Sequence, residues 1–499
     1  MIRLLALRSL FDRPWRSIFL LLGYSTGVGV MIVLLSIGEA LIAQASDERL
    51  VGGGEVTVLP EGLDVEVMKT GGLGGLFFSI DHSRFVYRQL LASSRLAGDI
   101  AAVAPQIEGK LLYLRTVRGI ELPVRASGEI PSLTAAVGAG ASLVDGSWTD
   151  DDADRRWHAP TPFELRHEID HFHLPATAGE SWGEWHYFNI VSADRRRWAF
   201  ISFIVGGAIP PDAAPTERWG GQLLVTLHDE GRPARRFSAI SPSSAVRFST
   251  SSADLAIGES HVTVLPDGRY ELRARAREEG RGGSVDVDLV IAPSPRAYFP
   301  GAALAGGEFT SGYVVPALRA DGTGRICAPG WCERFDAAQA YHDHNWGTWR
   351  GVTWEWGAAR AGEYAVLFGR VEPPDSISAP QPLFVYIVDS LGFVGLFRPR
   401  DVVYDTGRPM AVAGRPVSVP TRGTMVDVRG DDTLRIDLEV EDAAVTDTRQ
   451  GLIERGEALA ARGLRRPYFI QMKGLARLRG RVGGRPVVGE GTGFFETYR

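Results

Sequence analysis

The sequence has little cysteine, no long basic run and only one apolar run long enough to cross a membrane. Its 54 lysines and arginines face 60 aspartates and glutamates, which leaves a mild net charge of −6. The basic residues gather only in short clusters such as 195–197, so charge gives no case for nucleic acid as a partner. A single apolar run can make one membrane helix and not a channel.

The two cysteines, Cys327 and Cys332, are close neighbours in the sequence. Two interpretations stay open for them: reduced free thiols, or a short-loop disulfide, which an oxidising compartment would favour. The nearby His342 and His344 make a Cys/His zinc site conceivable, but C-x4-C is not the usual ligand spacing. The sequence therefore predicts no metal site.

The composition is that of a folded chain with many turns. Hydrophobic residues make up 44% and charged residues 23%, which is enough apolar material for real cores. The 59 glycines and 29 prolines suit an all-β chain better than a helical one. A chain of 499 residues has room for about three domains.

The N-terminal region predicts a membrane anchor. Residues 1–16 hold four arginines and one acid, and no charged residue occurs from Ser17 to Gly38. Roughly 20 apolar residues span the hydrocarbon core as a helix, and the basic flank marks the cytoplasmic side. We therefore expect a cytoplasmic tail over 1–16, an anchor over 17–43 in a bacterial inner membrane, and the bulk of the chain in the periplasm. A cleaved signal peptide is the alternative, because Ala43-Gln44-Ala45 resembles a small-residue cleavage site.

The anchor also has a more specific pattern. The residues from Leu7-Arg8-Ser9-Leu10 to Leu35-Ser36-Ile37-Gly38-Glu39 resemble the first helix of ABC transporter permeases of the MacB/FtsX type. The following segment, 44–146, is similar to the start of their periplasmic core, which implies short strands and a helix around 83–96. The resemblance implies an ABC transporter ATPase or permease as a partner. Such a permease needs three further spans, so this chain alone cannot form the transport unit.

The C-terminal part predicts strands joined by tight turns. Pro266-Asp267-Gly268 is a turn sequence between two candidate strands, and 433–440 alternates apolar and polar residues as a half-buried strand does. One helix is expected at 452–462, with a glycine at its C-cap. Many short strands with regular turns predict barrels or sandwiches, and the length allows two β units, 147–330 and 331–499.

Two aromatic segments with titratable groups are the candidates for chemistry. The first is 181–188 (SWGEWHYF), and the second is 341–347 (YHDHNWG), followed by Trp354-Glu355-Trp356. Indole walls exclude water around an apolar ligand, and a carboxyl among them has its charged form disfavoured. Strand alternation puts the side chains of the second segment on two faces: His342, His344 and Trp346 on one, and Tyr341, Asp343 and Asn345 on the other.

Ordinary structural roles would explain the same residues. A tryptophan-rich stretch packs a core more often than it binds a ligand. Asp343 could cap a turn, paired histidines could hydrogen-bond the backbone, and Glu184 could pair with an arginine. From the residues alone, the functional and the structural interpretation both stay open.

The two segments and the C-terminal 491–496 (GTGFFE) together resemble the AttH/CrtC family, which includes carotenoid 1,2-hydratases, also called hydroxyneurosporene synthases. The resemblance covers about residues 157–499. It implies two tandem lipocalin-like β-barrel units, a hydrophobic ligand within or between them, and no organic cofactor. The implied reaction is protonation of an isolated alkene followed by capture of water.

The resemblance also implies roles for individual residues. Asp343 would donate the proton, His342 or His344 would position water, and Tyr341 and Trp346 would shape the site. The other residues expected to line it are Trp182, Glu184, Trp185, Trp354 and Trp356.

The sequence thus predicts a mostly β protein, with two lipocalin-like barrel units after one transmembrane helix and a small α+β extracytoplasmic segment. We expect a cofactor-independent hydratase, a carbon–oxygen lyase, acting on a lipophilic unsaturated substrate of carotenoid or isoprenoid type. The alternative is a non-catalytic lipid-binding accessory of an ABC exporter.

Overall fold

The computed structural model describes most of the chain beyond residue 181 and parts of the chain before it. The helix predicted at 452–462 lies outside the described residues. The chain forms two compact units, Met1–Ser79 with Ile100–Arg155, and Ile80–Asp99 with Arg156–Arg499. The described residues are 14–46, 56, 83, 86–87, 90, 99–117, 119, 121–137, 149–155, 170–175, 182–280, 282–306, 309–348, 351–372, 382–412, 414–449 and 464–499.

The first unit contains the helix that the sequence predicts as a membrane anchor. Helix α2 (Pro14–Ser46) has one stretch, Pro14–Val33, that is long and apolar enough to cross a membrane. Its apolar side chains, such as those of Leu21 and Tyr24, are exposed instead of packed against protein. The unit also has an antiparallel hairpin and two short helices: β1 (Gln106–Arg115), β2 (Glu121–Glu129), α5 (Pro131–Ala136) and α6 (Asp152–Arg155).

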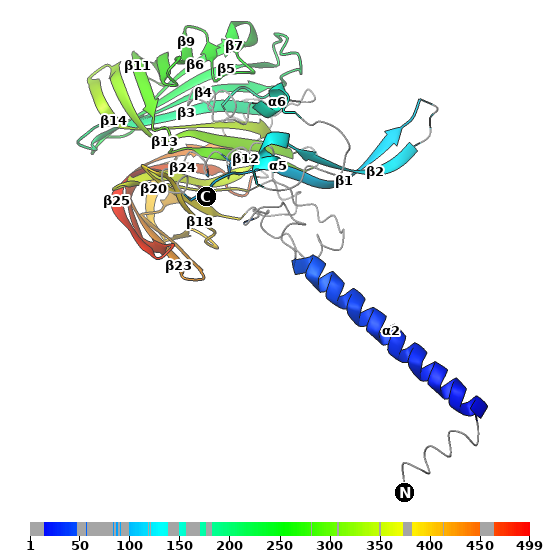
Figure 1. Cartoon of the computed structure of the whole chain (residues 1–499). Coiled ribbons are helices and arrows are strands. Elements are labelled where there is room, and N and C mark those ends of the chain that lie inside the picture. Colours follow the sequence, from blue (N-terminus) through cyan, green and yellow to red (C-terminus); the bar gives the residue numbers. More distant parts are fainter. Residues whose placement is uncertain are drawn as a thin grey trace. The chain divides into compact units, whose positions relative to one another are not determined.

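In the described part of the second unit, eight antiparallel strands close into a ring, here called the first barrel (Figure 1). The ring closes because β10 pairs with both β6 and β11, and β14 pairs with both β13 and β3. A closed barrel of about eight strands can be filled by side chains or hold one small ligand. Its strands, in ring order, are β3 (Trp182–Val191), β4 (Arg197–Gly207), β5 (Trp219–Asp229), β6 (Arg235–Pro242), β10 (Tyr270–Glu278), β11 (Ser284–Pro293), β13 (Phe309–Ala328) and β14 (Trp331–Thr348).

Short strands add to this barrel. β9 pairs with β10, β8 pairs with β9, and β7 pairs with β8, while β12 pairs with β13. The short strands are β7 (Val246–Phe248), β8 (Leu255–Ile257), β9 (Ser260–Val264) and β12 (Phe299–Gly306).

The rest of the second unit forms a curled antiparallel sheet, here called the second sheet. Side-chain hydrogen bonds connect the end of β18 (Gly392–Phe397) with β22 (Arg422–Arg429). The backbone N–H of Arg398, directly after β18, donates to the Asp427 carboxylate (2.6 Å), and the Arg429 guanidinium donates to the Leu396 carbonyl (3.2 Å). The prediction of a mostly β chain with two β units is confirmed. The strands in sheet order are β18 (Gly392–Phe397), β17 (Phe384–Asp389), β16 (Tyr364–Glu372), β15 (Thr353–Ala361), β25 (Arg485–Tyr498), β24 (Tyr468–Val482), β23 (Asp432–Asp447), β22 (Arg422–Arg429) and β19 (Val403–Tyr404), and β20 (Arg408–Val412) pairs separately with β21 (Arg415–Val419).

The boundary between the β units lies after β14. The sequence placed it between residues 330 and 331, but β14 hydrogen-bonds to β13 and β3 and so belongs to the first barrel. The second sheet begins with β15 at Thr353. Hydrogen-bond partners decide which sheet a strand joins, and the sequence does not show them.

A disulfide bond closes the β13–β14 hairpin. Cys327 and Cys332 are bonded and face each other across the two strands. The turn between the strands contains Gly330, whose φ of 70° is a conformation that glycine adopts without strain. Of the two interpretations left open, the disulfide therefore holds, and neither sulfur is a free thiolate for a zinc ion.

The described residues of the second unit form three apolar cores. One fills the first barrel and one lies within the second sheet. The third joins the two β units, because Trp198 and Phe200 of β4 pack in the same cluster as Leu367 of β16 and Phe494 of β25. Burial of apolar surface is the main source of stability, so the two β units stabilise one another.

Candidate functional site

The site is organised by two neighbouring strands of the first barrel, β14 and β3. They pair in antiparallel register, with His344 opposite His186 and Asp343 opposite Tyr187. Side chains alternate along each strand, so one set enters the barrel and the other faces the second sheet. The side chains of residues 341–346 therefore divide between these two faces, as the alternation predicts.

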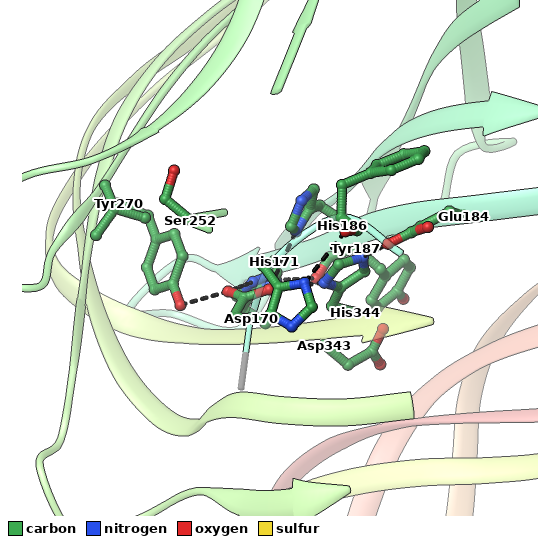
Figure 2. Close-up of polar contacts among 12 residues, drawn as sticks. Asp170, His171, Glu184, His186, Tyr187, Ser252, Tyr270, Asp343 and His344 are labelled. Carbon is green, nitrogen blue, oxygen red and sulfur yellow. Dashed lines mark hydrogen bonds and ion pairs between the residues drawn. The ribbon is translucent and has the colours of Figure 1, made fainter. Parts of the chain in front are cut away.

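The first group, here called the barrel cluster, lies inside the first barrel. It consists of Asp170, His173, Glu184, His186, His342 and His344. Asp170 is fully buried at its centre, between the Tyr270 hydroxyl on one side and His344 on the other (Figure 2). The Tyr270 hydroxyl donates to Asp170 Oδ2 at 2.6 Å, and His342 Nε2 lies 3.1 Å from the same oxygen.

His344 connects the two carboxyl groups of the barrel cluster. Its Nδ1 lies 2.7 Å from Asp170 Oδ1, and its Nε2 lies 2.8 Å from Glu184 Oε1. The backbone N–H of His173 donates to both oxygens of Glu184, at 2.8 and 3.0 Å. The His173 ring stacks on the Trp346 indole with ring centroids 3.6 Å apart. His173 is the partly exposed member of the cluster, so it marks the side from which solvent reaches it.

Burial and charge work against each other in the barrel cluster. Burial favours the neutral form of Asp170, but the surrounding imidazoles outweigh it and hold the pKa of that carboxyl well below its ordinary range. Burial likewise lowers the pKa of His344, but its two carboxyl partners raise that pKa to about 9. Burial and the neighbouring His344 hold the pKa of His186 well below its ordinary value. The cluster thus contains one imidazole with a raised pKa, His344, and two with lowered pKa values, His173 and His186.

The second group, here called the interface cluster, lies between the first barrel and the second sheet. It consists of Tyr341, Asp343, Asn345, Trp356 and Glu496. Asp343 Oδ2 accepts from the Tyr341 hydroxyl at 2.8 Å and from Trp356 Nε1 at 3.1 Å, and Oδ1 accepts from the Asn345 amide at 2.7 Å. Burial and the nearby Glu496 raise the pKa of Asp343 to about 8 despite these three donors. A carboxyl in this state keeps its proton at neutral pH.

Glu496, the second carboxyl of the interface cluster, comes from the C-terminal strand β25. Its Oε2 accepts from Trp354 Nε1 at 2.9 Å and its Oε1 from the Gln471 amide at 3.1 Å. Gln471 also donates to the Tyr187 hydroxyl on β3 at 3.3 Å. Burial raises the pKa of Glu496. Groups from both β units therefore hold two buried carboxyls in the interface cluster.

A cleft opens beside the interface cluster. It is small, with room for about one water molecule. Tyr341, which donates to Asp343, is part of its wall. Aromatic and small apolar residues from both β units dominate this wall, among them Trp198, Leu318, Ala358 and Phe494. Asn189, Arg319, Gln339 and Arg360 also line the cleft, so its wall is apolar in part and polar in part.

Two glycines make room for the two central tryptophans. A Cβ added at Gly312 would come within 2.1 Å of the Trp346 indole, and one added at Gly369 would come within 2.4 Å of the Trp356 indole. Real Cβ atoms do not approach this closely. The position of each indole therefore depends on the absence of a side chain on the neighbouring strand.

The structure divides the predicted site residues between the two clusters. His342 and His344, which were expected to position water for Asp343, bond Asp170 and Glu184 instead. The residues on the barrel side are Trp182, Glu184, His342, His344 and Trp346. Those on the interface side are Trp185, Tyr341, Asp343, Trp354 and Trp356.

Several residues of the two clusters were not predicted from the sequence. Asp170 and His173 lie in the run DHFH, and two histidines so close to an acid are a local signal for polar chemistry that could have identified them. His186 and Glu496 lie within segments that were singled out, but no role was given to them. Tyr270 carries no local signal, because only the barrel closure brings it to Asp170.

The donor atoms of the barrel cluster form two groups of three that could hold a metal ion. One is Asp170 with His186 and His342, and the other is His173 with Glu184 and His344. Within each group, the donor atoms lie within 4.8 Å of one another.

No protein-family model matches the chain, and no curated protein matches it. The resemblance of the N-terminal region to ABC transporter permeases thus gains no support. The solved structures that are similar to the chain include the following three. A protein described as an AttH from Nitrosomonas europaea is 15% identical, and the similarity covers 71% of this chain and 98% of that one, with a TM-score of 0.42. Kievitone hydratase from Nectria haematococca is 14% identical, with 68% and 98% covered and a TM-score of 0.40. CghA is 13% identical, with 68% and 95% covered and a TM-score of 0.38. Identities this low do not say which residues react.

Proposed function

We propose that this chain is a membrane-tethered hydratase, which adds water to an isolated double bond of a lipophilic substrate or removes water in the reverse direction. The observation that carries the proposal is the enclosure of the Asp343 carboxyl between the two β units. Its neighbours are aromatic, and the Tyr341 hydroxyl connects it to the wall of the cleft. Such surroundings combine an acid with a largely apolar wall, at which the substrate chain would bind.

The proposed reaction needs no group beyond water and Asp343. The Asp343 O–H bond breaks as its proton forms a C–H bond with one alkene carbon, which leaves a cation on the other carbon. Aromatic rings stabilise such a cation. Tyr341 and Phe494 both line the cleft, and their ring centroids lie 4.8 Å apart. Water then forms a C–O bond with the cation and gives a proton back to the Asp343 carboxylate. The acid is restored at the end of the cycle.

The cellular location is part of the same proposal. The basic flank of helix α2 favours a cytoplasmic N-terminus and an extracytoplasmic second unit. The bond between Cys327 and Cys332 supports this orientation, because disulfides persist mainly in oxidising compartments. We therefore place the second unit outside the cytoplasm, tethered near a membrane that would contain lipophilic substrates.

The test uses the full chain in detergent with a mixed lipid and isoprenoid extract, and mass spectrometry of what is bound and what is changed. We expect a product heavier than its parent by one water. Asp343→Asn should keep the fold and the bound substrate and lower turnover by about 10²–10⁴-fold. Asp288→Asn is the matched control, since Asp288 is an exposed carboxylate on β11.

Two results would count against the proposal. Turnover unchanged in Asp343→Asn would exclude this residue as the acid. A lipid that the wild-type chain retains unchanged would make the protein a lipid-binding module, and the hydratase assignment would be withdrawn.

A further inference from the structure

The barrel cluster has a feature that the hydratase chemistry does not use. We infer that Asp170, His186 and His342 form a binding site for a divalent transition-metal ion, with zinc the best-fitting class. The site lies on the barrel side of β14, and Asp343 is directed to the other side. This inference is therefore independent of the proposed reaction.

The distances suit a single ion. Asp170 Oδ1 lies 3.6 Å from His186 Nδ1, and Asp170 Oδ2 lies 3.1 Å from His342 Nε2. With bonds of about 2.0–2.2 Å, ligand atoms around a tetrahedral zinc lie roughly 3.3–3.6 Å apart. Asp170, His186 and His342 are at most 1% exposed. The ligand atoms of all three side chains lie within 4.8 Å of one another, which is close enough for one ion to contact all three.

The tautomer of His342 gives the strongest argument. Its Nδ1 lies 3.0 Å from the Tyr187 backbone carbonyl, which can only accept, so Nδ1 carries the hydrogen and donates. In the neutral ring, Nε2 then has a lone pair, and this lone pair faces an oxygen of Asp170. Two electron-rich atoms 3.1 Å apart need a cation or a proton between them. A histidine fixed by Nδ1–H to a carbonyl, with Nε2 toward the metal, is a common arrangement at metal sites.

His186 decides between a proton and a metal ion. Its Nδ1 is buried and makes no hydrogen bond within the described residues. A proton shared by Asp170 and His342 would satisfy those two groups but would leave His186 Nδ1 without a partner. One divalent ion between the three side chains would satisfy all of them. A buried polar atom without a partner is costly, so the ion accounts for more of the geometry.

The surroundings also fit a divalent ion. The Tyr270 hydroxyl donates to Asp170 at 2.6 Å and holds the carboxylate in place, as outer partners of metal ligands do. Two imidazole nitrogens and one carboxylate favour zinc or a similar ion over magnesium or calcium, which prefer oxygen ligands.

The second group of three donors is satisfied without an ion. Both nitrogens of His344 face carboxylates, and Glu184 accepts from the His173 backbone. The second group of donors therefore gives no comparable reason to expect a metal ion.

The experiment measures metal content and needs no substrate. The full chain is purified in detergent without a histidine tag or chelator, and first-row metals are quantified by mass spectrometry. We expect about one ion per chain. After removal with a chelator, cobalt should restore the site and give visible absorption bands typical of a nitrogen- and oxygen-bound ion.

Variants locate the ion. His186→Gln and His342→Ala should lose it or weaken cobalt binding by at least about tenfold, as loss of ligands and their partners does. Tyr270→Phe, which keeps the ring and removes one hydrogen bond, should weaken binding without loss of the fold. His261→Ala, a partly exposed histidine on β9, is the matched control and should keep the ion. Asp343→Asn should keep it too, which separates this test from that of the hydratase.

Three results would overturn the inference. The first is a folded wild-type chain that binds no metal and shows no cobalt bands. The second is unchanged cobalt affinity in a folded His186→Gln variant. The third is loss of the ion in His173→Ala with retention in His186→Gln, which would place it in the second group of donors.

Discussion

His342 and Asp343 are consecutive residues of β14, and their side chains bond partners in different clusters. His342 Nε2 lies 3.1 Å from Asp170 inside the first barrel, whereas Asp343 accepts from Trp356 of the second sheet at 3.1 Å. The two side chains differ in their partners because successive side chains of a strand point to opposite faces of the sheet. Changes to the two residues should therefore have separable effects.

The glycine beneath Trp356 gives one prediction. Gly369→Ala should push this indole away from Asp343, lower turnover and destabilise the protein by about 1–3 kcal/mol. Gly312→Ala should displace Trp346 from His173 at a similar cost in stability, but without loss of the Asp343 contacts. Thermal denaturation and turnover measure both effects. Gly282→Ala, where an added Cβ meets no atom within 4 Å, is the control. Equal stability of Gly369→Ala and wild type would refute the prediction.

Glu355 predicts a pH dependence of stability. This carboxyl is buried in the second sheet, accepts from Tyr404 at 2.9 Å and Thr497 at 2.8 Å, and burial raises its pKa to about 7. Between its ordinary pKa and about 7 the unfolded chain releases the proton and the folded chain keeps it. The free energy of unfolding should therefore fall as pH rises through this window and level off above it.

The measurement is urea unfolding at pH 5 and pH 8 in wild type and Glu355→Gln. The glutamine has no proton to release, so the variant should lose less stability between the two values, by up to roughly 3 kcal/mol. Parallel pH profiles for the two proteins would show that Glu355 does not titrate in this range.

The disulfide gives a prediction by chemical labelling. Alkylation of the unfolded chain without reductant should modify neither Cys327 nor Cys332, and labelling of both would contradict the bond. Replacement of both by serine should lower the free energy of unfolding by about 2 kcal/mol, since the closed loop is short. A larger loss would indicate that the bond also holds the hairpin in register.

The membrane anchor can be tested by fractionation. Peptides from residues 17–43 should be recovered with the rest of the chain in the membrane fraction after a carbonate wash. A soluble chain that begins near Ser46 would show that this segment is a cleaved signal instead.

Much of this fold could be predicted from local patterns. The charge-free run of α2 indicates a membrane helix by its length, and the alternation of a strand correctly predicts that Asp343 and His342 lie on opposite faces. The unit boundary was wrong because a hairpin turn at 329–330 has the same local sequence whether or not a domain ends there. Only the pairing of β14 with β3 assigns it to the first barrel.

The barrel cluster could not be predicted as a unit. Its members come from a segment before β3, from β3 itself and from β14, which is more than 150 residues away in the sequence. Asp170 meets His344 only because the ring of strands closes, so the relevant spacing is spatial and not sequential. The resemblance to the hydratases assigned His342 and His344 to the same reaction as Asp343, although adjacent residues of a strand point to opposite faces.

Because the two faces of β14 contact different parts of the protein, they also determine which sequence changes this strand tolerates. A substitution at an even-numbered position between 338 and 346 alters the barrel interior, and one at an odd-numbered position between 341 and 345 alters the contact with the second sheet. Each surface can thus be modified while the other is left intact. One inserted or deleted residue would exchange every side chain between the two. The segment should therefore accept replacement of single residues and reject any change in its length.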